Sequence, residues 1–141
     1  MPDSRHSVSV AGVVVNDAGQ ALLIQRRDNL HWEAPGGVLE QDEDIIAGLQ
    51  REVLEETGLE VMPEALTGVY KNMSRGIIAL VFRCRAVGGA LGTSDETRDF
   101  RWVSKEDVTE LSDEAFAIRV IDALTLPAAV PVRQHDGVHL L

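Results

Sequence analysis

The sequence predicts a single α/β domain. Its 141 residues suit one hydrophobic core. Strand-like apolar runs come first, a glycine turn and a long helix follow, and further strands precede two helices near the end. Elements in this order pack as layers, with helices covering a sheet. We expect the core over about residues 7–126 and a C-terminal tail, without a clear period, over residues 127–141.

Two strands are expected before the glycine turn. Val8 to Val15 reads VSVAGVVV, which is apolar and largely β-branched, and Ala21 to Ile24 is apolar again. The residues between them, Asn16-Asp17-Ala18-Gly19, are typical of a turn. This pattern predicts a β-hairpin in the core.

The longest helix is expected after Gly36-Gly37. Acidic residues at positions 42–44 suit a helix N-terminus. Gly58 suits a left-handed stop, so the helix should run to about Thr57. Gly48 costs up to about 1 kcal/mol relative to alanine in a helix interior. It projects toward the acidic side of the helix, where its missing side chain leaves room.

The acidity of the chain is concentrated in this segment. Positions 40–60 hold eight acids and one base, Arg51, which gives −7 of the formal net charge of −10. Like charges three or four residues apart repel by roughly 0.2–0.5 kcal/mol per pair. A hard divalent cation would relieve this repulsion, because Mg²⁺ prefers oxygen ligands.

At 100° per residue, one sector of the helix is apolar and another is acidic. The apolar sector holds Ile46, Leu49 and Val53, and the acidic sector holds Glu52, Glu55 and Glu56.

The spacing of this segment resembles the Nudix box of the Nudix hydrolase family. Gly37 is followed after five residues by Glu43, and after seven more by REVLEETGL at positions 51–59. Every fixed position of the box is present, although Asp42 and Gly48-Leu49 stand where members often have glycine and a pair of small residues. A Glu-rich helix is commonly a solvated face, but this spacing argues against that interpretation.

The resemblance implies an α/β/α sandwich with a mixed β-sheet, and metal-dependent hydrolysis of a nucleoside diphosphate linked to another group. Glu43 would orient other groups, with Arg51 as its partner. Glu96, which follows a flexible loop, would be a further metal ligand or the base that takes a proton from water, against the alternative of a solvated loop acid. The implied ligands of Mg²⁺, or of Mn²⁺ in its place, are the Gly36 carbonyl, Glu52, Glu55, Glu56 and Glu96.

Substrate contacts are expected around the box. Arg26 and Arg27 leave a core strand, and they are either solvated or ligands of phosphate, for which arginine offers a bidentate fork. Trp32 packs under the glycine turn or stacks on a base. Gly37 lets the backbone approach a ligand closely. Base specificity is expected at scattered positions, such as Arg26, Trp32, Tyr70, Asn72 and Phe82.

The rest of the chain predicts further layers of the domain. An antiparallel strand pair is expected, then a loop, a strand and two helices. In the tail, Arg133, His135 and His139 have no assigned role beyond a contact with substrate or a partner subunit. The expected ranges are 66–73 and 77–87 for the pair, 88–95 for the loop, 100–103 for the strand, a short helix capped at Ser104, and a helix over 113–124 that ends by Pro127.

Composition excludes several classes of protein. No apolar run reaches the length of about 18 residues that spans a bilayer, and residues 1–7 lack the layout of a signal peptide. Cys84 is the only cysteine and lies in an apolar run, so a core side chain in a reducing, cytoplasmic compartment is expected rather than a nucleophile. A net charge of −10 argues against binding long nucleic acid, but a single nucleotide arriving with magnesium is compatible.

Three functions compete within this frame. The first is hydrolysis of a nucleoside triphosphate, an oxidised one included, to the monophosphate and pyrophosphate. The second is hydrolysis of ADP-ribose or another nucleotide sugar or dinucleoside diphosphate, which in the family often uses an added N-terminal sheet; the short lead before residue 8 argues against it. The third is a non-catalytic nucleotide sensor, whose sign would be missing box glutamates. Whether the chain forms a homodimer stays open.

Overall fold

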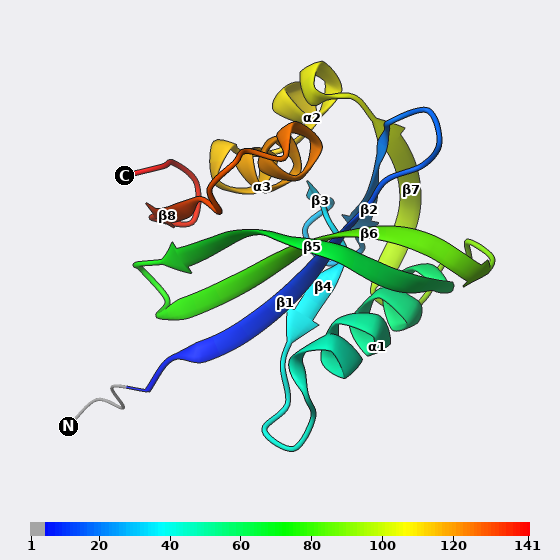
Figure 1. Cartoon of the computed structure of the whole chain (residues 1–141), viewed down its shortest axis with the longest axis horizontal. Helices are drawn as coiled ribbons and strands as arrows, with labels where there is room; N and C mark the ends of the chain where they lie inside the picture. The colour runs from blue at the N-terminus through cyan, green and yellow to red at the C-terminus, as the bar shows by residue number, and fades with distance from the viewer. Residues whose placement is uncertain (1–4) are drawn as a thin grey trace.

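The computed structural model describes residues 5–141 (Figure 1). The first four residues of the lead segment, which entered the signal-peptide argument, lie outside it. No helix in the described part of the chain is long and apolar enough to cross a bilayer. The elements are β1 (Ser7–Val14), β2 (Ala21–Arg26), β3 (Trp32–Glu33), β4 (Gly36–Val38), α1 (Ile45–Thr57), β5 (Leu59–Asn72), β6 (Ile77–Gly89), β7 (Thr97–Val103), α2 (Lys105–Leu111), α3 (Glu114–Thr125) and β8 (Val132–His135).

The strands form two sheets. The larger has the order β4-β1-β6-β5-β8, and the smaller has the order β3-β2-β7. In the larger sheet β1 runs parallel to β6, with Ala11 opposite Val81, and β8 runs parallel to β5, with Val132 opposite Val69. The other pairs are antiparallel. The expected mixed sheet is therefore confirmed.

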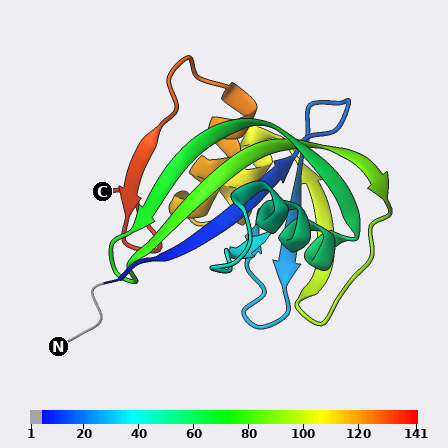
Figure 2. The same cartoon turned by 60° about the horizontal axis from the view of Figure 1, so that its bottom comes forward.

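Helices cover both sides of the sheets. Figures 1 and 2 show α1 on one side and α2 with α3 on the other. Successive side chains of a strand point to opposite faces, and β1 supplies both cores accordingly. Val10 and Val14 belong to the core under α1, whereas Ala11 and Val13 belong to the core under α3. This arrangement confirms the α/β/α sandwich.

The predicted β-hairpin between the first two strands is wrong. β1 and β2 belong to different sheets, and a single bridge, Val15 to Ala21, joins the segments. The turn itself is present, because the Oδ1 atom of Asn16 accepts the N–H groups of Ala18 and Gln20. The local sequence specifies this turn, but the partners of each strand come from far along the chain. β1 lies between β4 and β6, and β2 lies between β3 and β7.

The helix boundaries follow the sequence closely. Asp44 caps α1 by accepting the Ala47 N–H at 2.8 Å, and Gly58 ends it with φ of 82°. A capping box between Ser104 and Asp107 opens α2. The predicted apolar sector of α1 is wrong at Ile46, because the side chain of this residue is exposed. Burial in α1 begins at Gly48, so the first turn does not pack on the sheet.

The apolar run around Cys84 forms part of the core, as expected. The Cys84 side chain is fully buried in the cluster under α1. Burial raises the pKa of its thiol to about 12. A thiol that stays protonated at neutral pH is a poor nucleophile, so the interpretation as a core side chain is confirmed.

The tail contains a strand that the sequence did not predict. β8 lies at the edge of the larger sheet beside β5. Arg133 holds it against α3 by donating from Nε and Nη2 to the two carboxylate oxygens of Asp122, each at 2.8 Å. His135, at the end of β8, is fully buried. Both Arg133 and His135 therefore have contacts within their own chain.

Candidate active site

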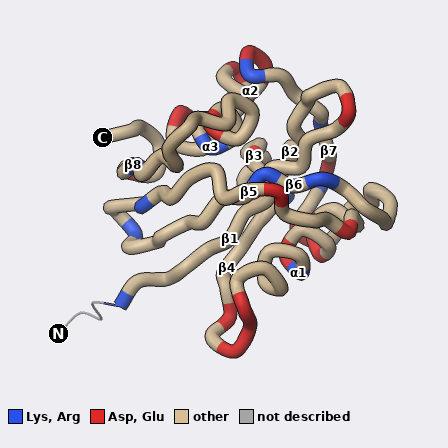
Figure 3. Tube along the Cα trace, in the orientation of Figure 1, with Lys and Arg blue, Asp and Glu red and all other residues tan. Residues whose placement is uncertain are grey.

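The acidic segment forms one continuous surface beside the glycine turn. Figure 3 shows the acids gathered on the loop before α1 and along α1 itself. Leu49 and Val53 anchor the helix in the core, so the direction of its carboxylates is fixed. Those nearest the sheet point back to β4, the short strand that holds Gly36 and Gly37.

Glu56 is the most buried of these carboxylates, with 7% of its surface exposed. Its Oε1 atom accepts the backbone N–H of Gly36 at 2.7 Å. Burial raises the pKa of Glu56 to about 8, the Gly36 hydrogen bond opposes this shift, and the charges of nearby Glu52, Glu33 and Glu96 add to it. No basic side chain in the described chain hydrogen-bonds to Glu56. An ionised Glu56 therefore lacks a counter-charge.

Arg51 neutralises the neighbouring acids. It donates from Nε and Nη2 to the two oxygens of Glu43, at 2.9 and 2.6 Å, which confirms the expected partnership. Its Nη1 atom reaches Glu52 at 3.0 Å and Glu55 at 3.3 Å. The hydrogen bond from Arg51 lowers the pKa of Glu43 to about 2. Burial raises the pKa of Glu52, and Arg51 opposes that shift.

Two glycines make room for these side chains. A Cβ atom on Gly37 would overlap the carboxylate of Glu52. A Cβ atom on Gly48 would lie 2.9 Å from Oε1 of Glu43 and would overlap Leu39. The space that Gly48 was expected to leave is thus filled by Glu43, the partner of Arg51.

Glu96 is an exposed residue of the loop directly before β7, and its charge raises the pKa values of Glu52 and Glu56. The N–H of Glu96 donates to the Ser94 hydroxyl at 3.3 Å. Arg27 braces the same loop, because its Nε atom donates to the Ser94 carbonyl at 2.8 Å and its backbone N–H donates to the Glu96 carbonyl at 2.9 Å. Arg27 does not line the cavity of about 670 Å³ that lies beside the glycine turn.

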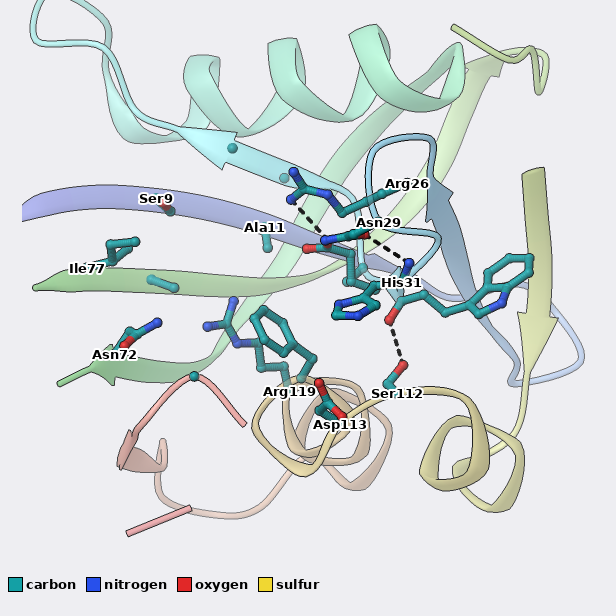
Figure 4. Close-up of a pocket in the computed structure, with 18 of the residues that line it drawn as sticks. Ser9, Ala11, Arg26, Asn29, His31, Asn72, Ile77, Ser112, Asp113 and Arg119 are labelled. Carbon is teal, nitrogen blue, oxygen red and sulfur yellow. Dashed lines mark hydrogen bonds and ion pairs between the residues drawn. The ribbon is translucent and has the colours of Figure 1, made fainter. Parts of the chain in front are cut away.

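A cavity of about 670 Å³ opens beside the glycine turn (Figure 4). Gly36, Gly37 and Trp32 line it, as does Arg26, whose guanidinium is paired with Asp28 at 2.6 Å and with Glu33 at 3.3 Å. Several further lining residues come from segments far apart in the sequence, among them Ser9, Ala11, Asn72, Ile77, Ser112, Phe116 and Arg119.

The cavity includes some of the residues that were expected to contact the base and excludes others. Asn72 and Trp32 line the cavity with Arg26. Tyr70 is fully buried, and its hydroxyl donates to Asp122 at 2.7 Å, so it belongs to the core and the prediction was wrong. Phe82 packs against the core under α1, on the side of the sheet away from α3, and does not line the cavity. A fully buried side chain and one that packs on the opposite face are both out of reach of a ligand in the cavity.

Sequence reasoning missed Glu33, Phe116 and Arg119. Glu33 stands in the segment that precedes the glycine turn, next to Trp32, and a single acid there has no distinctive pattern. Phe116 and Arg119 lie on α3, whose pattern predicts only a packing helix. The sequence signal for Arg119 is a single base among apolar residues on a helix that faces a sheet, and this signal is too common to indicate a site.

The carboxylates fit a divalent cation chemically. They offer hard oxygen donors, and buried Glu56 has acidic neighbours in place of a counter-ion. Within residues 5–141, no three His, Cys, Asp or Glu side chains already converge on one point. Arg51 contacts two of the box glutamates, Glu52 and Glu55, and within the described residues it makes no ion pair with Glu56.

Known proteins share this sequence and fold. The NUDIX domain family matches residues 5–124. The chain is 54% identical to a MutT-like protein of Streptomyces ambofaciens, over 96% of this chain and 88% of that one. It is 35% identical to the human 8-oxo-dGDP phosphatase NUDT18, over 94% of this chain and 36% of that one, and 30% identical to an ADP-ribose pyrophosphatase of Methanocaldococcus jannaschii, over 75% and 66%. A crystal structure of a MutT protein from Methanosarcina mazei superposes with a TM-score of 0.76 at 27% identity, over 92% of this chain and all of that one. The chain therefore belongs to the Nudix family of hydrolases, which act on nucleoside diphosphate-linked substrates.

Proposed function

We propose that this chain hydrolyses a nucleoside triphosphate, oxidised forms included, to the monophosphate and pyrophosphate with Mg²⁺, for which Mn²⁺ can substitute. One observation carries the proposal. Glu56 is buried against the glycine turn without a counter-charge, and Gly36, to which it is hydrogen-bonded, lines a cavity large enough for a nucleoside. A cation with a diphosphate provides the charge that this arrangement lacks.

The cation is held by the Gly36 carbonyl with three box glutamates, Glu52, Glu55 and Glu56. When bound, it supplies charge neutralisation for the phosphate oxygens and acidifies an attacking water. Arg51 contacts Glu52 and Glu55, so a bound cation would share these carboxylates with the guanidinium.

The protein groups around the cation have separate tasks. Glu96 is the first choice for the proton acceptor, because it is exposed beside Glu52 and Glu56 on a loop that Arg27 braces. A box glutamate is the alternative. Water forms the new P–O bond, the bridging P–O bond breaks, and the proton of the water passes to the carboxylate. Arg51 and Glu43 position the box glutamates, while Arg26, Trp32 and Gly37 contact the substrate.

The choice of a nucleoside triphosphate is supported by similarity to a putative 8-oxo-dGTP diphosphatase of Bacillus subtilis, 34% identical over 65% of this chain and 62% of that one. The relative with the highest identity quoted above is a MutT-like protein that aligns nearly end to end. The human relative acts on an oxidised guanine nucleotide, although this chain spans about a third of its length. An ADP-ribose pyrophosphatase is also similar, at lower identity and coverage, so ADP-ribose is the second candidate. The intact box glutamates support an enzyme over a sensor.

Product analysis tests this function. The protein is incubated with Mg²⁺ and separate samples of dGTP, 8-oxo-dGTP, 8-oxo-dGDP, ATP and ADP-ribose, and phosphorus NMR identifies the products. We expect monophosphate and pyrophosphate from a triphosphate. Higher kcat/KM for ADP-ribose, or release of inorganic phosphate from a nucleoside triphosphate, would contradict the proposed reaction.

Light scattering on the same sample determines whether the single domain that we infer for residues 1–141 forms a homodimer.

A further inference from the structure

The α3 side of the cavity contains a guanidinium with an unsatisfied donor. Arg119 projects from α3 toward the space between the helix and the larger sheet (Figure 4). Its carbon Cζ lies 5.3 Å from the centre of the Tyr70 ring and 4.7 Å from the centre of the Phe116 ring. The Nε atom is buried and has no hydrogen-bond partner within residues 5–141. Aromatic faces hold the cation in place, but they accept none of its in-plane hydrogen bonds.

His135 does not supply the missing acceptor. Its Nε2 atom lies 3.3 Å from Nη2 of Arg119. Its Nδ1 atom accepts the backbone N–H of Gly137 at 2.9 Å, which places the proton of a neutral imidazole on Nε2. Burial and the nearby Arg119 charge lower the pKa of His135, which favours this neutral form. Nε2 is therefore a donor that faces another donor.

Asn72 presents a third donor to the same space. Its Oδ1 atom accepts the N–H groups of Ser74 at 3.0 Å and Arg75 at 3.2 Å, which fixes the orientation of the amide. Its Nδ2 atom is directed toward the side of the cavity where Arg119 lies (Figure 4). Glu33 attracts the Arg119 charge, but its carboxylate accepts a hydrogen bond from Arg26 instead. The wall formed by Arg119 and Asn72 thus offers donors and needs an acceptor.

Small side chains form part of the cavity floor beside this wall. Ser9 on β1 lies opposite Ala79 on β6 in the sheet register, and both line the cavity. Ala11, two residues further along β1, lines it as well. Small side chains on one face of neighbouring strands leave room for a planar ring. The site therefore has the shape for a base and the donors for a keto oxygen.

We propose that Arg119, together with the Nδ2 amide of Asn72, binds a keto oxygen of the nucleobase, so that the cavity selects guanine-type bases over adenine. Guanine presents acceptors at O6 and N7, which arginine binds in a bidentate manner, whereas adenine presents an amino donor beside N7. That donor would face the donors of both side chains. A buried donor left unpaired disfavours the wrong base strongly. This inference rests on the proposed nucleotide hydrolysis and adds the base that the site selects.

Calorimetric binding of GMP and AMP without divalent ions tests the base preference apart from hydrolysis. The wild type should bind GMP more tightly than AMP. In Arg119→Met, which keeps a long side chain between the two rings, affinity for GMP should fall about 10- to 100-fold, while affinity for AMP should change much less. Arg85→Met, at an exposed position of β6, is the matched control and should retain the preference.

A second variant guards against loss of folding. Asn72→Asp keeps an oxygen for the Ser74 and Arg75 N–H groups, but it places a carboxylate where the amide donor was, facing Arg119. It should lose the GMP preference while thermal unfolding shows an intact fold. Equal affinity of the wild type for GMP and AMP, no binding of either, or an unchanged preference in both variants would overturn the inference.

Three further results separate related explanations. If Arg119→Met weakens GMP and AMP equally and also weakens inhibition by pyrophosphate, Arg119 binds a phosphate group and the base assignment is wrong. If the wild type prefers GMP but hydrolyses no nucleotide, the proposed function fails and the base site stands. If hydrolysis proceeds with equal kcat/KM for GTP and ATP, the function stands and the base site fails.

Discussion

The carboxylate of Glu56 and the backbone N–H of Gly36 are joined by a 2.7 Å hydrogen bond across 20 positions of sequence. This bond ties α1 to β4, so the acidic helix and the glycine turn are held as one unit. Glu56 is also buried, and its neighbours are other acids. A carboxylate held in this way is organised for a positive ligand.

Gly37→Ala should reduce hydrolysis without unfolding the protein. The added methyl group would overlap the carboxylate of Glu52 and displace it from its present position. We expect kcat/KM to fall by about tenfold or more, with little change in Tm. Gly92→Ala is the control, because a Cβ atom at Gly92 meets no other atom within 4 Å. Equal activity in the two variants would show that Glu52 does not need its present position.

Arg51→Lys should also reduce activity, because lysine cannot hold both oxygens of Glu43 as the arginine fork does. Kinetic assays at saturating Mg²⁺ should show a loss of about 10- to 100-fold. Glu43→Gln should act in the same direction. The double variant should lose little more activity than the less active of the two single variants, since both changes break the same contact between Arg51 and Glu43. Losses that multiply would mean that the two residues act independently.

Metal-free stability should depend on pH through Glu56. Its pKa rises from 4.5 in the ordinary state to about 8 in the folded protein, so the folded state binds this proton more tightly. Stability from this group is fully present below about pH 4.5 and is lost as the pH rises through about 8. The Tm of the wild type minus that of Glu56→Gln should therefore fall over this window. Added Mg²⁺ should raise the wild-type Tm more at pH 8 than at pH 5. A difference that stays constant with pH would contradict the assignment.

Arg133→Met should loosen the C-terminal strand. The substitution leaves buried Asp122 with the hydroxyl of Tyr70 as its remaining side-chain partner. Removing one partner of a buried pair is costly, but Arg133 is about one-third exposed, with 34% of its side-chain surface accessible. We expect a loss of about 1–2 kcal/mol of unfolding free energy after this discount for solvent screening. Hydrogen exchange in β8 should rise, and Arg85→Met should show neither effect.

Local signals in the sequence predicted the helices and the centre of the site. Asp44, Gly48 and Gly58 each act through neighbours within a few residues, so their roles in α1 were visible in the sequence. The contact between Arg51 and Glu43 is also short in sequence, and the spacing of the box indicated it.

Long-range pairing limited the rest. A turn at Asn16 fits a hairpin or a crossing between sheets equally well, and the choice depends on β6 and β7, more than 60 residues later. The same holds for β8, whose short segment becomes a strand because β5 offers an open edge. Arg119 became a candidate only when the fold placed it beside Asn72 and left its Nε atom without a partner.

Hydrolysis of a nucleoside triphosphate by Glu56→Gln at saturating Mg²⁺ tests the central claim most directly. Glutamine keeps the shape of the side chain and can still accept the Gly36 N–H, but it removes the negative charge. Glu110→Gln, at an exposed position of α2, is the control and should retain full activity. We predict that Glu56→Gln loses at least about tenfold in kcat/KM while its Tm is maintained. A wild-type rate in Glu56→Gln would remove this carboxylate from the mechanism and contradict the account.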